Sequence, residues 1–128
     1  MRTIILKSLC LAASFLALVT ASHAVTKDNF LVRDTNDIIA LCTAPGTDPL
    51  YTAAVHFCHG YLVGAYHYQD ALYSGPGRTP LVCPPNPKPS RDQAIAGYIA
   101  WARQHPEYGK ALTVNTMMKY AVERWPCK

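Results

Sequence analysis

Four cysteines follow residue 40, and they constrain the fold more than any other feature of the chain: Cys42, Cys58, Cys83 and Cys127. A fifth cysteine, Cys10, lies in an N-terminal segment that we expect to be removed. An even number of cysteines in a small exported chain indicates a framework of structural disulfides. We therefore predict two disulfides, and four cysteines can be paired in three ways.

The first 24 residues have the pattern of a secretory signal peptide. Arg2 and Lys7 flank an apolar run over residues 4–18, and small residues occupy positions 22 and 24 before the expected cleavage after Ala24. A transmembrane anchor needs about 20 uninterrupted apolar residues, and Lys7 interrupts this run. We predict a periplasmic protein with no membrane anchor in the mature chain, which comprises residues 25–128.

Charge and length exclude several classes of protein. The formal net charge of the 128 residues is +4, but without the signal peptide ten basic residues face eight acidic ones. Such a small excess is not typical of a nucleic-acid-binding protein, so we expect no nucleic-acid partner. Half of the residues are hydrophobic and 16% are charged, which indicates one packed domain and not a disordered chain.

The mature chain contains four stretches with helical patterns and no convincing strand. Thr35 or Asn36 is expected to cap a short helix that ends near Cys42. Asp48, followed by a proline, is expected to cap a long helix that ends near Tyr73. Apolar residues recur there at intervals of three and four, which predicts one buried face made of Ala54, Phe57, Tyr61, Gly64, Tyr68 and Ala71.

The remaining two helices are predicted from their ends. Ser90 and Gln93 have the spacing of a capping box, and His105-Pro106 is expected to stop the helix that they begin. A last helix follows Gly109 and extends to Trp125. We therefore predict an all-α fold, a small disulfide-linked bundle of four or more helices.

The position of Cys83 in a proline-rich loop, just before the last two predicted helices, bears on the disulfide pairing. Residues 74–89 contain six prolines, so this segment favours stiff, extended geometry around Cys83. If the last two helices form an antiparallel hairpin, Cys127 returns close to Cys83. This arrangement favours Cys83–Cys127 and, by elimination, Cys42–Cys58. A Cys58–Cys83 pairing remains open.

No pattern in the chain indicates catalysis. His56, His59 and His67 lie at helical spacings that allow zinc or copper binding, but a disulfide at Cys58 and the absence of an acidic residue at a metalloprotease spacing favour boundary histidines. The sequence has no Gly-x-Ser-x-Gly turn and no paired carboxylates, and the cysteines are expected to be oxidised. We expect no enzymatic activity, no metal and no cofactor.

Tyrosines are concentrated on the predicted long helix, which carries five of the eight. Tyr61 and Tyr68 are expected in the core. Tyr66 and Tyr73 share another stripe with His59, which is either a surface for protein contact or part of a wide buried face.

Short fragments around the cysteines resemble a known family. These fragments are Leu41-Cys42, Phe57-Cys58-His59-Gly60-Tyr61-Leu62-Val63-Gly64, Val82-Cys83-Pro84-Pro85, Tyr98-Ile99 with His105-Pro106-Glu107, and Ala121 with Trp125-Pro126-Cys127. Together they are similar to the Tai/Rap family of type VI secretion amidase immunity proteins. The similarity covers nearly all of the mature chain.

This resemblance implies a function in binding. Proteins of this family are exported helical proteins, often homodimers, that occlude the active-site cleft of a cell-wall amidase of the papain-like cysteine type. The resemblance places the inserted element near the later helices, with residues 74–89 as a second candidate. The residues implied to contact the partner are Gln104, His105, Glu107, Tyr108 and Lys110.

A second function from another class is a small disulfide-bonded periplasmic chaperone or stress-response binding protein. In that case its tyrosine and methionine surfaces would bind client proteins, and its histidines would make binding respond to pH. Inhibition of one amidase at fixed stoichiometry separates the first function from the second.

Overall fold

A computed structural model describes residues 24–128 of the chain, so the predicted signal peptide lies, except for Ala24, outside the described residues. Within this range the structure contains four α-helices, two short 3-10 helices and no strand, which confirms the predicted all-α fold. None of the described helices is long and apolar enough to cross a membrane. In chain order the elements are η1 (Lys27–Leu31), α1 (Thr35–Cys42), α2 (Tyr51–Tyr73), α3 (Arg91–Gln104), η2 (Pro106–Tyr108) and α4 (Thr113–Arg124).

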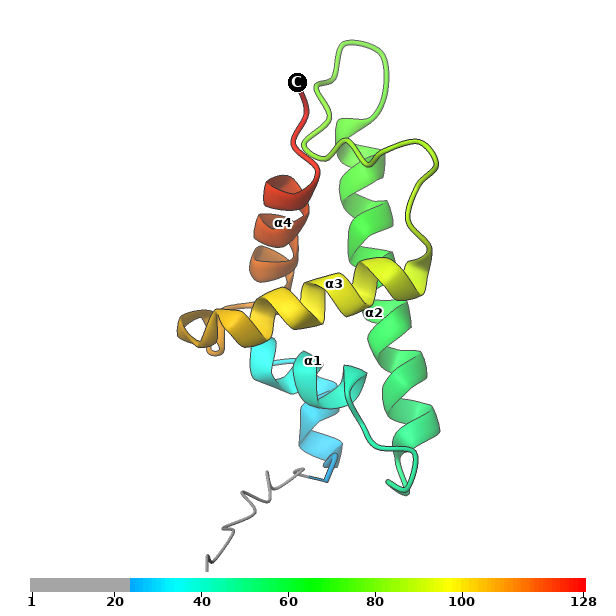
Figure 1. Cartoon of the computed structure of the whole chain (residues 1–128), viewed down its shortest axis with the longest axis vertical. Helices are drawn as coiled ribbons and strands as arrows, with labels where there is room; N and C mark the ends of the chain where they lie inside the picture. Colours follow the sequence, from blue (N-terminus) through cyan, green and yellow to red (C-terminus); the bar gives the residue numbers. More distant parts are fainter. Residues whose placement is uncertain (1–23) are drawn as a thin grey trace, which may run out of the picture.

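The four α-helices pack around one core. α2 follows the long axis of the molecule, and α3 lies across it between α1 and α4 (Figure 1). Each α-helix contacts the other three. The expected antiparallel hairpin of the last two helices is therefore wrong, because α3 runs across the direction of α4 and not alongside it. The chain turns sharply between them, at residues 105–112.

The predicted disulfides are confirmed even though the hairpin is not. Cys42 is bonded to Cys58, and Cys83 is bonded to Cys127. The proline-rich loop brings Cys83 to the end of the chain, where its backbone N–H donates to the Trp125 carbonyl at 2.9 Å. One disulfide therefore joins α1 to α2, and the other fixes the loop to the segment that follows α4.

The buried face of α2 agrees only in part with the predicted one. Ala54 is buried and Tyr61 packs against the core as predicted, but Tyr68 is 70% exposed and Phe57 is 37% exposed. Cys58 and Leu62 are buried instead. The helix carries apolar residues on more than one side, so spacing alone does not identify the inner face. The disulfide to Cys42 decides it, because it turns Cys58 and the residues one helical turn away toward α1.

The helix starts also differ in detail. Asp34 caps α1 by accepting a hydrogen bond from the Asp37 N–H at 3.1 Å. The Thr35 side chain is instead buried and donates a hydrogen bond to the Ala111 carbonyl. α2 begins at Tyr51, because Asp48 first closes a turn in which its carboxylate accepts from the Leu50 N–H. For α3 the predicted capping box of Ser90 and Gln93 is confirmed.

Candidate functional site

The end of α3 and the turn that follows it contain all five residues that the family resemblance implies for partner contact. Gln104 ends α3 and is exposed, and His105 follows it as the C-cap. Glu107 is exposed, Tyr108 is half-buried, and the Lys110 side chain is 86% exposed. The turn projects from one side of the molecule, beyond the end of α3 (Figure 1). The contact role of these residues remains a prediction.

Three aromatic rings support this turn: Tyr108 stacks on Trp101, and His105 packs against both at a tilt. The Trp101 indole of α3 lies with its ring centroid 4.6 Å from His105 and 5.7 Å from Tyr108, and the Tyr108 ring is tilted only 8° from it. The amine of Lys119, from α4, lies 5.6 Å from the Tyr108 ring centroid, within the range of a cation–π contact. The turn is therefore held by side chains from both neighbouring helices.

Polar groups surround the stack. Nδ1 of His105 lies 2.9 Å from Oε1 of Glu107, and this hydrogen bond lowers the pKa of Glu107. The Trp101 indole N–H donates to Glu123, which also pairs with Lys119 at 2.9 Å. The ion pair with Lys119 lowers the pKa of Glu123. These bonds fix the orientation of the rings while leaving the outer face of the turn open to solvent.

The backbone of the turn is attached to the start of α1. The N–H of Asn36 donates to the Gly109 carbonyl at 3.0 Å, and the N–H of Thr35 donates to the Ala111 carbonyl at 2.9 Å. Lys110 pairs with Asp34 at 2.9 Å. A Cβ atom at Gly109 would lie 2.7 Å from Oδ1 of the exposed Asn36 side chain, which would have to move to make room for it. The free N–H groups at the start of α1 thus hold the turn in place.

A chain of buried hydroxyl groups continues this attachment into the core. The Tyr98 hydroxyl lies 2.8 Å from Oγ1 of Thr116, which lies 2.9 Å from Oγ1 of Thr35. Thr35 in turn donates to the Ala111 carbonyl. Burial raises the pKa of Tyr98, so the phenol stays protonated and able to donate. One hydrogen-bonded network therefore joins α1, α3 and α4 beneath the turn.

Sequence reasoning identified the turn but not the side chains that support it. Trp101 and Lys119 are not among the predicted contact residues. Trp101 lies on α3 and Lys119 on α4, and the two side chains come together only when these helices pack in the folded protein. One signal was available, because Trp101 precedes His105 by four residues, which is one helical turn. The position of Lys119 over Tyr108 depends on the crossing of α3 and α4 and has no sequence signal.

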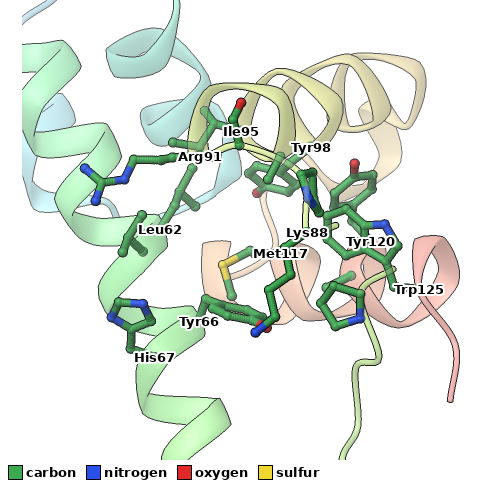
Figure 2. A pocket seen from close by; sticks show the side chains of 16 residues that line it. Leu62, Tyr66, His67, Lys88, Arg91, Ile95, Tyr98, Met117, Tyr120 and Trp125 are labelled. Carbon is green, nitrogen blue, oxygen red and sulfur yellow. The ribbon is translucent and has the colours of Figure 1, made fainter. Parts of the chain in front are cut away.

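A pocket of about 250 Å³ lies on another part of the surface. Figure 2 shows it between α2, the start of α3 and α4, with Tyr66 and Met117 facing it and Lys88 extending over it from the proline-rich loop. Its lining is mainly apolar and contains no carboxylate. Tyr66 belongs to this pocket, whereas Tyr73 is 40% exposed, so the second tyrosine stripe is neither a uniform surface nor a uniform core.

The histidines of α2 do not converge. His56 is exposed, His67 lies at the pocket, and Nδ1 of His59 is 3.9 Å from Oδ1 of Asp92. Cys58 is held in its disulfide. In residues 24–128, no group of three or more histidine, cysteine, aspartate or glutamate side chains is arranged to hold a metal ion.

Comparison with known proteins assigns the family. No curated protein and no solved structure matches the chain. The family model of the Rap1a immunity proteins matches residues 34–127. This range includes all four disulfide-bonded cysteines, the helices α1 to α4 and the turn between α3 and α4. Two disulfides are also typical of proteins exported to an oxidising compartment. The chain therefore belongs to the family of Rap1a immunity proteins.

Proposed function

We propose that this protein binds a type VI secreted peptidoglycan amidase of the papain-like cysteine type in the periplasm. It inhibits the amidase by inserting the α3–α4 turn into the active-site cleft. Family membership supports an immunity function against an effector protein. The observation that carries the assignment to this turn is the packing of His105 and Tyr108 against Trp101, which is preformed and anchored to two helices.

A preformed turn suits an inhibitor for a physical reason. Ordering a loop upon binding costs free energy, so an element that already has its bound shape binds more tightly. Tyrosine and tryptophan bury much area and lose little entropy, and they are enriched among the residues that dominate binding energy. The exposed ends of the turn, Gln104 and Lys110, then form the polar rim of the contact.

The proposed mechanism needs no chemistry from this protein. All four cysteines within residues 24–128 are in disulfides. In this proposal the protein acts by occluding the amidase cleft and catalyses no reaction of its own. We also propose that it forms a homodimer, as proteins of the Tai/Rap type often do, and size-exclusion chromatography with light scattering measures this directly.

The experiment is an inhibition titration. The exported protein is added to papain-like peptidoglycan amidases of type VI effectors, and peptidoglycan hydrolysis is followed. We expect one amidase to be inhibited at fixed stoichiometry with a dissociation constant of about 1 nM, the range of tight protein inhibitors. Glu107→Arg is expected to weaken inhibition while leaving the fold intact. Asp92→Arg, the same charge change at the other end of α3, is the matched control.

Two outcomes oppose the proposal. If no amidase is inhibited, and the protein instead suppresses aggregation of unrelated unfolded proteins near pH 3 to 5, the chaperone function replaces it. If an amidase is inhibited but Glu107→Arg and Asp92→Arg behave alike, the contact lies elsewhere. The first place to test in that case is the proline-rich loop, residues 74–89.

A further inference from the structure

Near the start of the described chain, the backbone makes a buried hydrogen bond to a carboxylate. The backbone nitrogen of Val25 donates to Oδ2 of Asp48 at 2.8 Å. Both residues are buried, with 7% of Val25 and 9% of Asp48 exposed, and the Val25 side chain belongs to the hydrophobic core. Ala24, one residue earlier, is exposed. The chain therefore enters the core at the residue that follows the expected cleavage point.

Asp48 is a buried acid that lacks a cationic partner in the described part of the chain. Its other oxygen, Oδ1, accepts from the Leu50 N–H at 2.8 Å, and its main chain closes the turn before α2. Among the ion pairs within residues 24–128, none includes Asp48. A carboxylate removed from water is costly unless a charge or several strong hydrogen bonds compensate it. Two amide N–H groups supply part of that compensation.

Cleavage after Ala24 would change the chemistry of this contact without moving it. A signal peptidase adds water across the Ala24–Val25 peptide bond, leaving a carboxylate on Ala24 and an amino group on Val25 that takes up a proton. The nitrogen that now donates as an amide then donates as an ammonium. We propose that removal of the signal peptide completes this fold, by placing the α-ammonium of Val25 on Asp48 as a buried ion pair.

This pair would join the new N-terminus to the turn between α1 and α2. That turn follows Cys42 and precedes Cys58, so the ion pair and the disulfide act on the same connection. A charge-assisted hydrogen bond is shorter and stronger than a bond between neutral donor and acceptor. The processed protein is therefore more stable than a chain that still carries residues before Val25.

The test uses the full chain, exported with its own signal peptide and purified from the periplasm. Intact mass must first show that the protein begins at Val25. Asp48→Asn keeps an acceptor for the Leu50 N–H but removes the negative charge. A second variant carries one serine inserted after Ala24, so that its ammonium lies one residue away from Asp48. Asp92→Asn, at a carboxylate that is 85% exposed, is the matched control.

We expect Asp48→Asn and the serine insertion each to lower the melting temperature by about 5 to 10 °C, which is a large shift for a domain of this size. Asp92→Asn is expected to leave the melting temperature nearly unchanged. In the insertion variant, Asp48→Asn is expected to cost much less than in the native chain, because the ammonium has already been displaced. An equal cost in both backgrounds overturns the proposal, and so does a mature protein that begins at any residue other than Val25.

A second measurement does not depend on the Asp48 variant being stable. The native protein is treated with a limiting amount of an amine-acetylating reagent at neutral pH, and acetylation of the Val25 amine is quantified by peptide mapping. We expect this amine to react several-fold more slowly in the folded protein than in the same protein unfolded in guanidinium. It should also react more slowly than the N-terminal amine of the folded serine-insertion variant. Equal reactivity in all three samples contradicts a buried ion pair.

Discussion

The ring of Tyr108 lies nearly parallel to the indole of Trp101, with 5.7 Å between the ring centroids and 8° between the ring planes. Tyr108 comes from the turn and Trp101 from the helix before it, so this stack fixes the turn to α3. Lys119 covers the Tyr108 ring from α4. The residues proposed to enter the amidase cleft are thus positioned before any partner arrives.

Replacing the Trp101 side chain should weaken binding to the amidase more than it destabilises the fold. Trp101→Leu keeps an apolar side chain on α3 but removes the surface on which His105 and Tyr108 lie. We expect the dissociation constant for the amidase to rise about thirtyfold, because His105 and Tyr108 lose the support that holds them in position for contact. Calorimetric titration measures this, with circular dichroism to confirm the helical content. The control is Tyr68→Leu, because Tyr68 is 70% exposed on α2; equal effects of the two variants contradict a role for the stack.

Two glycine-to-alanine changes should have opposite effects on stability. At Gly109 the new Cβ would lie 2.7 Å from Oδ1 of the Asn36 side chain, which is exposed and can rotate away at low cost, so Gly109→Ala is expected to lower the free energy of unfolding by less than about 1 kcal/mol. At Gly64, in the middle of α2, nothing lies within 4 Å, and Gly64→Ala is expected to raise it by about 1 kcal/mol.

Denaturant titration of the purified variants measures both effects. Adding Asn36→Ala to Gly109→Ala removes the close contact, so the double variant should lose less than the sum of the single changes. Simple additivity, or a stabilising Gly109→Ala, contradicts the close packing of the turn on α1.

The disulfide at the C-terminus should be a main source of stability. Cys83 and Cys127 are separated by 44 residues, and closing a loop of this length stabilises a protein by about 4 kcal/mol in the chain-entropy account. We expect Cys127→Ser to lower the melting temperature markedly in oxidising buffer. After complete reduction of both proteins, the variant and the native chain should melt at nearly the same temperature. An equally large difference under both conditions would mean that Cys127 stabilises the fold by packing and not by its bond.

Asp37 should make stability depend on pH in the acid range. Burial alone would raise the pKa of Asp37, but hydrogen bonds from Arg33 and Asn29 outweigh burial and lower it. A lowered pKa means that the contribution is present above the usual value of 3.8 and is lost as the pH falls below it. Asp37→Asn is therefore expected to cost about 2 kcal/mol at pH 7 and much less at pH 2.

The measurement is urea unfolding between pH 7 and pH 2. Asp28→Asn is the control, because Asp28 forms only an exposed 3.8 Å contact with Arg33 and is expected to change stability by less than about 1 kcal/mol. A constant cost of Asp37→Asn across this pH range would show that the charge of Asp37 does not contribute.

Local signals in the sequence predicted the local structure. The capping box of Ser90 and Gln93 and the stop at His105-Pro106 marked the bounds of α3, because both act through neighbouring backbone groups. The start of α1 was harder to place, since Asp34, Thr35 and Asn36 are all good capping residues. The choice of Asp34 follows from a distant contact, the bond between the Thr35 N–H and the carbonyl of Ala111.

Features that depend on packing between distant segments were not predictable in this way. α2 has apolar residues on several sides, and the Cys42–Cys58 bond selects the buried one. η1 is an exception, because it was missed although its capping box of Thr26 and Asn29 is a local signal. The turn was predicted by family resemblance, but its support by Trp101 and Lys119 arises only when α3 and α4 cross.

Hydrogen–deuterium exchange of the protein with and without its amidase tests the central claim most directly. The account predicts that binding slows exchange at residues 104–110 and leaves the pocket segments, near Tyr66 and Ala94, unchanged. Ala94→Trp, which places a bulky side chain at this pocket, should leave inhibition intact. Protection confined to the pocket, together with loss of inhibition in Ala94→Trp, would contradict the assignment of the α3–α4 turn as the inhibitory element.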